Sequence, residues 1–182
     1  MVVAKTEFAM SHVAQQFFEH SIERTYQALV WGLPDPPDGT VTGYIGRSAQ
    51  DRRASTLYDD PEKGKWSVTH YKTLEALHYV ALVQCNLETG RTHQIRAHMR
   101  GIGHPLFNDA LYGGDRALRG PQAGSHRQFV QNAFALLPRQ ALHAKSLGFK
   151  HPRTGQWLQF DSDLPPDFSA ALTKWRGLMA HG

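Results

Sequence analysis

Cysteine is almost absent from this chain of 182 residues, in which Cys85 is the only one. One thiol excludes an internal disulfide and any zinc site built from several cysteines, and it fits the reducing conditions of the cytoplasm. No stretch approaches the roughly 18 to 20 consecutive apolar residues that a membrane helix needs. The start of the chain also lacks the basic and apolar layout of a secretory signal. These absences predict a cytoplasmic protein without a membrane-spanning segment.

A large excess of positive or negative charge is also missing. Twenty Lys and Arg oppose sixteen Asp and Glu, which leaves +4. The basic residues are nevertheless concentrated between positions 91 and 150, where only Asp109 and Asp115 oppose them: Arg91, Arg96, Arg100, Arg116, Arg119, Arg127, Arg139, Lys145 and Lys150. This placement predicts a basic face that attracts polyanions, although a solvated surface without such a role has the same composition.

Metal-binding and nucleotide-binding patterns are absent as well. His93, His98 and His104 are spaced by five and six residues, which does not place them on one helical face, and no His-Glu-x-x-His pattern occurs. Gly113-Gly114 lacks the Gly-Lys-Ser/Thr pattern of a phosphate loop. The sequence therefore predicts no metal site.

What the chain does contain is a series of short strand patterns with a few helical ones. With 41% hydrophobic residues it can bury a substantial core, and we expect one domain over residues 1–182. Strands are predicted at 1–4, 26–31, 68–77, 79–87, 142–149 and 157–160, the last two joined by the Pro/Gly turn at 151–155. Because turns join most of the strands, the pattern favours an α+β protein with a mixed, largely antiparallel sheet flanked by helices.

Three helices are predicted. The first covers 6–20, with Thr6 as a possible N-cap and a buried face that includes Val13, Phe17 and Phe18. The second begins near Thr92, packs Ile95, Met99 and Ile102 inward, and ends at Gly101-Ile102-Gly103. The third follows Pro165-Pro166-Asp167 and turns Phe168, Leu172 and Trp175 inward.

The longest informative motif is the run Gly90-Arg91-Thr92-His93-Gln94-Ile95-Arg96-Ala97-His98-Met99, followed by the block His104-Pro105-Leu106-Phe107-Asn108-Asp109 and by Tyr112-Gly113-Gly114. This combination resembles the signature of the RluA-type RNA pseudouridine synthases, and the resemblance extends over nearly the whole chain. It implies that the protein converts uridine to pseudouridine in ribosomal or transfer RNA, without a metal or an organic cofactor. It also implies a catalytic domain of the pseudouridine-synthase type.

The resemblance assigns roles to six residues. Tyr26, in the segment Arg24-Thr25-Tyr26-Gln27-Ala28, is similar to the tyrosine that stacks on the uracil and is a candidate base for the sugar proton. Arg96 is similar to the arginine that pairs with the nucleophilic aspartate, although an arginine here could also be purely structural. Arg91, Thr92 and His93 are expected at a helix start that binds RNA phosphate. Asp109 is expected to be a structural cap.

The family's nucleophilic aspartate has no counterpart in a matching setting. In the family it belongs to a His-Arg-Leu-Asp-like motif upstream of a strand that is similar to residues 1–5, and His126-Arg127 is followed here by Gln128. The sequence thus resembles a catalytic domain that lacks its N-terminal part, and as it stands we expect it to be inactive. Residues 50–65 are expected to form a mobile surface hairpin or loop that orders on RNA.

Two alternatives remain open. The chain could be a non-catalytic RNA-binding module, or a half that pairs with a separately encoded partner. The first predicted strand would leave an unpaired sheet edge, for which a homodimer is the expected cover.

Overall fold

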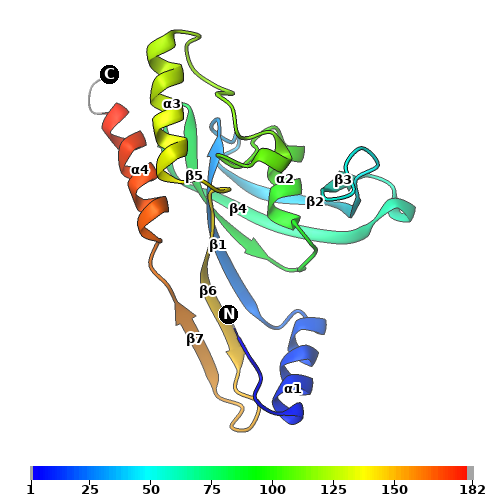
Figure 1. Cartoon of the computed structure of the whole chain (residues 1–182). Coiled ribbons are helices and arrows are strands. Elements are labelled where there is room, and N and C mark those ends of the chain that lie inside the picture. The colour runs from blue at the N-terminus through cyan, green and yellow to red at the C-terminus, as the bar shows by residue number, and fades with distance from the viewer. Residues whose placement is uncertain (1, 180–182) are drawn as a thin grey trace.

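The computed structural model describes residues 2–179, in which seven strands form one sheet with helices on both of its faces (Figure 1). The strand order is β3-β2-β4-β5-β1-β6-β7, and all neighbouring strands are antiparallel. The strands are β1 Glu23–Trp31, β2 Asp38–Arg47, β3 Ser55–Tyr58, β4 Lys65–Leu77, β5 Val80–Leu87, β6 Leu142–Lys150 and β7 Trp157–Asp161. The predicted α+β class with a largely antiparallel sheet is confirmed.

Strand β1 is the centre of this sheet because it pairs with β5 on one side and with β6 on the other. Its last four residues, Ala28 to Trp31, have no exposed surface. Such a run cannot alternate between polar and apolar residues, since both faces of the sheet are covered there. The continuous apolar run in the sequence is therefore a consequence of the strand's central position.

The four α-helices are α1 Glu7–Phe18, α2 Gln94–Gly101, α3 Gly124–Leu136 and α4 Pro166–Met179. Helices α3 and α4 pack together over one face, where Trp31, Phe107 and Trp175 are fully buried. Helix α2 covers the other face through Ile95 and Met99. Within residues 2–179, no helix is long and apolar enough to cross a membrane.

Helix α2 is fastened to β4 by two buried polar side chains. Gln94 donates to the carbonyl of Val68 and to Thr69 Oγ1, both at 2.9 Å. His98 lies between Thr69 Oγ1, 2.9 Å from Nδ1, and Ser67 Oγ, 3.1 Å from Nε2. Because Ser67 already donates its hydroxyl proton to Gly43, it accepts from Nε2–H of His98. Thr69 Oγ1 accepts from Gln94, so its own proton is available to Nδ1, which fits a neutral ring protonated at Nε2.

Helix α1 departs from its predicted packing. Its N-cap is Thr6, as predicted, but Val13 is its only buried residue, and Phe18 is 80% exposed. The helix is held to the end of β6 by Gln16, which donates to the carbonyl of Lys150 at 2.9 Å and accepts from its N–H at 2.8 Å. The prediction of a wider buried face was wrong. The spacing of the apolar residues fits a helix, but the rest of the protein covers only the part of α1 around Val13.

Other elements also differ from the sequence-based expectation. Residues 2–4 form no strand, so that prediction was wrong for them, and residue 1 lies outside the described residues. Strand β2 was overlooked although Val41, Gly43 and Ile45 alternate as its buried positions. Helix α3 was overlooked although Val130 and Phe134 lie one turn apart on its buried face. The segment 50–65, expected as a surface hairpin or loop, contains the short strand β3, which pairs antiparallel with β2 and so fits the hairpin alternative.

The buried ring of His98 makes stability depend on pH. Burial lowers its pKa from 6.5 to about 4, so between these values the unfolded chain binds more protons than the folded one. This contribution is fully present above pH 6.5 and is lost as pH falls toward 4. Between pH 7.5 and pH 5 we expect the free energy of unfolding to fall by about 2 kcal/mol through this residue.

Urea unfolding of the native chain and of His98→Gln at both pH values measures this effect. The variant should lose about 2 kcal/mol less on acidification than the native chain. Equal losses in the two proteins would show that His98 does not carry the dependence. The variant is needed because burial also lowers the pKa of His93. His93 therefore also reduces the free energy of unfolding as the pH falls.

Candidate functional site

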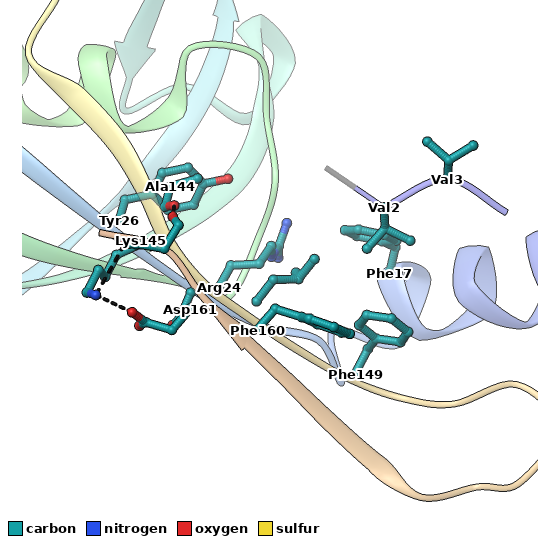
Figure 2. Close-up of a pocket in the computed structure, with 13 residues that line it drawn as sticks. Val2, Val3, Phe17, Arg24, Tyr26, Ala144, Lys145, Phe149, Phe160 and Asp161 are labelled. Atoms are coloured by element: carbon teal, nitrogen blue, oxygen red, sulfur yellow. Dashed lines mark hydrogen bonds and ion pairs between the residues drawn. The ribbon is translucent and has the colours of Figure 1, made fainter. Parts of the chain in front are cut away.

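Tyr26 lies on β1 at the wall of an open cavity of about 670 Å³ (Figure 2). It belongs to the same face as Ala28 and Val30, because side chains alternate along a strand, and this is the face that α2 covers. The pairing of β1 with β6 shifts at this point: Thr25 faces Ser146 and Tyr26 faces Ala144, so Lys145 is the extra residue of a β-bulge. Bulges next to sites change the direction of a side chain.

Charged groups surround Tyr26 in this cavity. Arg24 projects from β1 between Tyr26 and Phe17, and Lys145 forms an ion pair with Asp161 (Figure 2). Asp161 is the only carboxylate that lines the cavity in the described part of the chain. Sequence reasoning did not name Asp161, and it named Lys145 only as one of the basic residues between positions 91 and 150. They come from two different strands, so no local motif connects them.

Arg91 and Thr92 line a second cavity, of about 530 Å³, which is rich in basic side chains. Its other basic residues come from the end of β2, from the loop before β3 and from the start of β4: Arg47, Arg52, Arg53 and Lys65. Arg91 Nε donates to the carbonyl of Trp66 at 3.1 Å, and Arg53 pairs with Asp51 at 2.8 Å. The hydrogen bond from Arg53 lowers the pKa of Asp51 to about 2.

For Arg47, Arg52 and Lys65, no carboxylate partner lies within ion-pair distance in residues 2–179. The cavity therefore presents several uncompensated positive charges to solvent. The adjacent pair Arg52-Arg53 was the one local signal in the sequence for this cluster. Arg47 and Lys65 lie far from Arg91 along the chain and are brought beside it only by the sheet.

His93 does not share this cavity. It occupies the N-cap of α2 with φ 57°, a left-handed conformation that is uncommon for a residue other than glycine. Its Nδ1 is hydrogen-bonded to Tyr112 Oη at 3.1 Å. Burial, and next the charge of Arg96, lower the pKa of His93. The structure thus directs the ring toward Tyr112, and of the three predicted phosphate-binding residues only Arg91 and Thr92 line the basic cavity.

Arg96 is joined to Asp109 by two parallel hydrogen bonds of 2.7 Å, from Nε and from Nη2. The side chains are 11% and 1% exposed, so this is a buried ion pair. The guanidinium also stacks over the ring of Tyr112, 4.6 Å from its centroid. Asp109 in addition accepts from the N–H of Tyr112, as the expected cap of a 3₁₀ turn at Ala110–Tyr112.

The ion pair gives Arg96 a structural partner that the sequence analysis did not foresee. One edge of its guanidinium is used by Asp109, whereas no hydrogen bond within residues 2–179 uses Nη1. Tyr26 and Arg96 share no hydrogen bond, and Arg96 does not line the cavity of Tyr26. The five predicted site residues are thus not brought together: Tyr26 lines its own cavity, Arg91 and Thr92 line the basic cavity, Arg96 pairs with Asp109, and His93 is hydrogen-bonded to Tyr112.

The chain is similar in sequence to known RNA pseudouridine synthases. The family model described as RNA pseudouridylate synthase matches residues 1–100. An uncharacterized RNA pseudouridine synthase of Chlorobaculum parvum is 40% identical over 98% of this chain and 55% of its own length. The ribosomal large subunit pseudouridine synthase D of Zymomonas mobilis is 41% identical over 92% of this chain and 49% of its own length. The chain spans about half the length of these relatives.

Two solved structures share the fold. Human RNA pseudouridylate synthase domain containing 4 matches 97% of this chain and 70% of its own, with a TM-score of 0.72 at 22% identity. Human RNA pseudouridylate synthase domain containing 1 matches 93% of this chain and 66% of its own, with a TM-score of 0.70 at 28% identity.

The Arg96–Asp109 pair should be a major contributor to stability. Asp109→Asn keeps the shape and the cap but leaves the buried guanidinium without its counter-charge, so we expect a loss of about 3 kcal/mol in the free energy of unfolding. Asp163→Asn, at an exposed position, is the matched control and should change little. Urea denaturation measures the free energy of unfolding of both variants. A loss below about 1 kcal/mol for Asp109→Asn would contradict this prediction, because exposed ion pairs contribute that little.

Proposed function

The chain belongs to the RNA pseudouridylate synthase family, and on that premise we propose that it takes part in isomerising uridine to pseudouridine in ribosomal or transfer RNA. The observation that carries the proposal is the open cavity in which the ring of Tyr26 stands beside cationic side chains. A base turned out of its stack needs a flat aromatic partner and cations for its backbone. We place this activity in the cytoplasm, with which the buried free thiol of Cys85 is compatible.

In the proposed reaction, Tyr26 stacks on the uracil. A carboxylate attacks C1′ of the uridine, and the bond between C1′ and N1 breaks as its electron pair leaves with the uracil. The uracil then turns, C5 bonds to C1′, and the carboxylate leaves C1′. The C5 proton is lost and N1 gains a proton, so the conversion is an isomerisation. Tyr26 is our candidate for the base that removes a proton from the sugar and returns it when C5 bonds to C1′, since its side chain lines the cavity that would hold the nucleotide.

We propose that the nucleophilic carboxylate is not among residues 1–182. Asp161 lines the cavity, but its carboxylate is held by Lys145. Arg96 keeps a proposed role in this scheme: Asp109 takes the Nε and Nη2 edge, so the Nη1 side could hold a second carboxylate and keep it ionised. On this proposal residues 1–182 are the N-terminally incomplete catalytic domain, and alone they form no pseudouridine.

For RNA binding we propose Arg91 and Thr92 as phosphate contacts, supported by the uncompensated cations that share their cavity. His93 is proposed to act with them by shaping the start of α2, since its ring is bound to Tyr112. Phosphate contacts supply most of the affinity for a polynucleotide and make it salt-dependent.

A non-catalytic RNA-binding module is the second candidate, favoured by the ion-paired state of Asp161. The DNA directly upstream of the first codon discriminates between the candidates. An in-frame His-Arg-x-Asp-like motif there supports the enzyme, and a stop codon directly before the first codon supports the module.

Homodimerisation is also a proposal. Residues 2–4 form no strand, so its support is now the exposed apolar side chains of α1, which include Phe8, Met10 and Phe18. Sedimentation at tens of micromolar that shows only monomer would contradict it.

Activity should depend on the hydroxyl of Tyr26. In the extended protein, meaning this chain together with the segment encoded upstream, Tyr26→Phe keeps the stacking ring and should retain RNA affinity. The isomerisation rate should fall about 100-fold, the lower range for loss of a general base. Tyr26→Leu should weaken affinity as well, because base stacking contributes roughly 1–3 kcal/mol.

Single-turnover formation of pseudouridine, read by mass-shift labelling, measures the rate, and Tyr79→Phe on the far side of the sheet is the control. An unchanged rate in Tyr26→Phe would remove Tyr26 as the base. Multiple turnovers by the 182-residue chain alone would refute the proposal that its nucleophile is missing. Asp161→Asn would then test whether the carboxylate that lines the cavity is the nucleophile.

Arg91 should act on affinity rather than on rate. Arg91→Ala removes one phosphate contact, so the slope of log affinity against log salt should decrease in magnitude by about 0.7 for single-stranded RNA. Arg153→Ala, in the exposed turn between β6 and β7, is the matched control. Titrations at several salt concentrations measure both slopes, and equal slopes for the two variants would remove Arg91 from the RNA interface.

A further inference from the structure

Arg24 is a half-buried cation whose hydrogen bonds are incomplete. Its Nη2 donates to the carbonyl of Glu88 at 3.2 Å, and its guanidinium lies over the ring of Phe17, 5.6 Å from the centroid. Its Nε is buried and has no hydrogen-bond partner among residues 2–179. No carboxylate of residues 2–179 forms an ion pair with it. A buried charged donor without a partner is costly, which points to a ligand that supplies the missing acceptor.

The surroundings of Arg24 indicate that this ligand is an anion. Burial lowers the pKa of Arg24, whereas Tyr26 acts in the opposite direction. The other cation of the cavity, Lys145, is engaged by Asp161 (Figure 2). Arg24 is therefore the uncommitted positive charge beside Tyr26. Residues two apart on a strand are separated by about 6.6 Å and point to the same face, so Arg24 and Tyr26 can contact adjoining parts of one ligand.

Gly90 shows that Arg24 stands between the two cavities. A side chain at Gly90 would collide with Arg24 Nη1, so the absence of a Cβ lets the guanidinium lie against the backbone there. Gly90 also lines the basic cavity, together with Arg91 and Thr92. One face of Arg24 thus borders the cavity of Tyr26, and its tip reaches the segment that lines the basic cavity.

We propose that Arg24 binds a phosphodiester group of the RNA, next to the nucleotide whose base enters the cavity of Tyr26. The identification of the polymer as RNA rests on the proposed function. A phosphodiester has two charged oxygens, which can accept together from Nε and from a terminal nitrogen of the guanidinium. The strand would then continue past Gly90 to the cations of the basic cavity. Arg24 is in this scheme the positioning residue that fixes the backbone while the base is held by Tyr26.

The test uses the extended protein and two fluorescein-labelled probes: an oligouridylate with phosphate linkages, and the same oligomer with neutral methylphosphonate linkages. Arg24→Gln removes the charge. Gly90→Ala displaces the guanidinium and keeps its charge. Arg153→Gln is the matched control. Affinity is titrated at several salt concentrations, and unfolding in urea is measured in parallel.

For the phosphate probe, Arg24→Gln should reduce the magnitude of the salt slope by about 0.7, which corresponds to a roughly fivefold loss of affinity at about 0.1 M salt. Gly90→Ala should lower affinity in the same direction, and Arg153→Gln should leave the slope unchanged. For the neutral probe, the Arg24→Gln and native proteins should bind equally.

Two results would overturn the proposal: an unchanged slope in Arg24→Gln, or an equal loss of affinity for both probes. A variant that loses stability and rate but keeps the slope would instead assign Arg24 to a protein carboxylate, which also overturns it. The proposed function is judged separately by formation of pseudouridine. If the native extended protein forms none but shows the Arg24-dependent slope, the phosphate subsite stands and the enzymatic function fails.

Discussion

The buried amide of Gln94 determines the shape of the segment around which the candidate site is built. Its Nε2 donates to β4, while its Oε1 accepts from Thr89 Oγ1 at 2.8 Å and from the N–H of Arg91 at 2.9 Å. One side chain therefore fixes the turn at 89–93 and fastens the helix that follows. The position of Gly90 against Arg24 and the direction of Arg91 into the basic cavity both depend on this turn. Buried networks of this kind give a unique geometry when every member is satisfied.

The Arg96–Asp109 pair adds a second constraint at the other side of α2. It ties the helix to the 3₁₀ turn at Ala110–Tyr112, and the hydroxyl of Tyr112 accepts from the N–H of Ser55 at 2.8 Å at the start of β3. The strand that borders the basic cavity is thus connected to the same helix. A buried pair of opposite charges is tolerated in this position because both hydrogen bonds are short and parallel. The guanidinium has a structural partner, and no hydrogen bond in the described part of the chain uses its Nη1, so a structural role and the proposed catalytic role are compatible.

Local patterns in the sequence predicted much of this architecture. The strands that correspond to β1, β4, β5, β6 and β7, the N-cap Thr6 and the inward face of α4 follow from periodicity and turn chemistry. The buried face of α1 could not be predicted, because spacing indicates a helix but not how much of it is covered. The partner of Arg96 could not be predicted either, since Asp109 is brought to it by tertiary packing.

A structure of the extended protein bound to a uridine-containing RNA tests the central claim most directly, because the claim is that the cavity of Tyr26 receives the target base. We expect the uracil ring to be stacked on Tyr26, with a phosphodiester on Arg24 and further phosphates at Arg91. RNA bound on another surface, with the cavity of Tyr26 empty of nucleotide, would contradict this account.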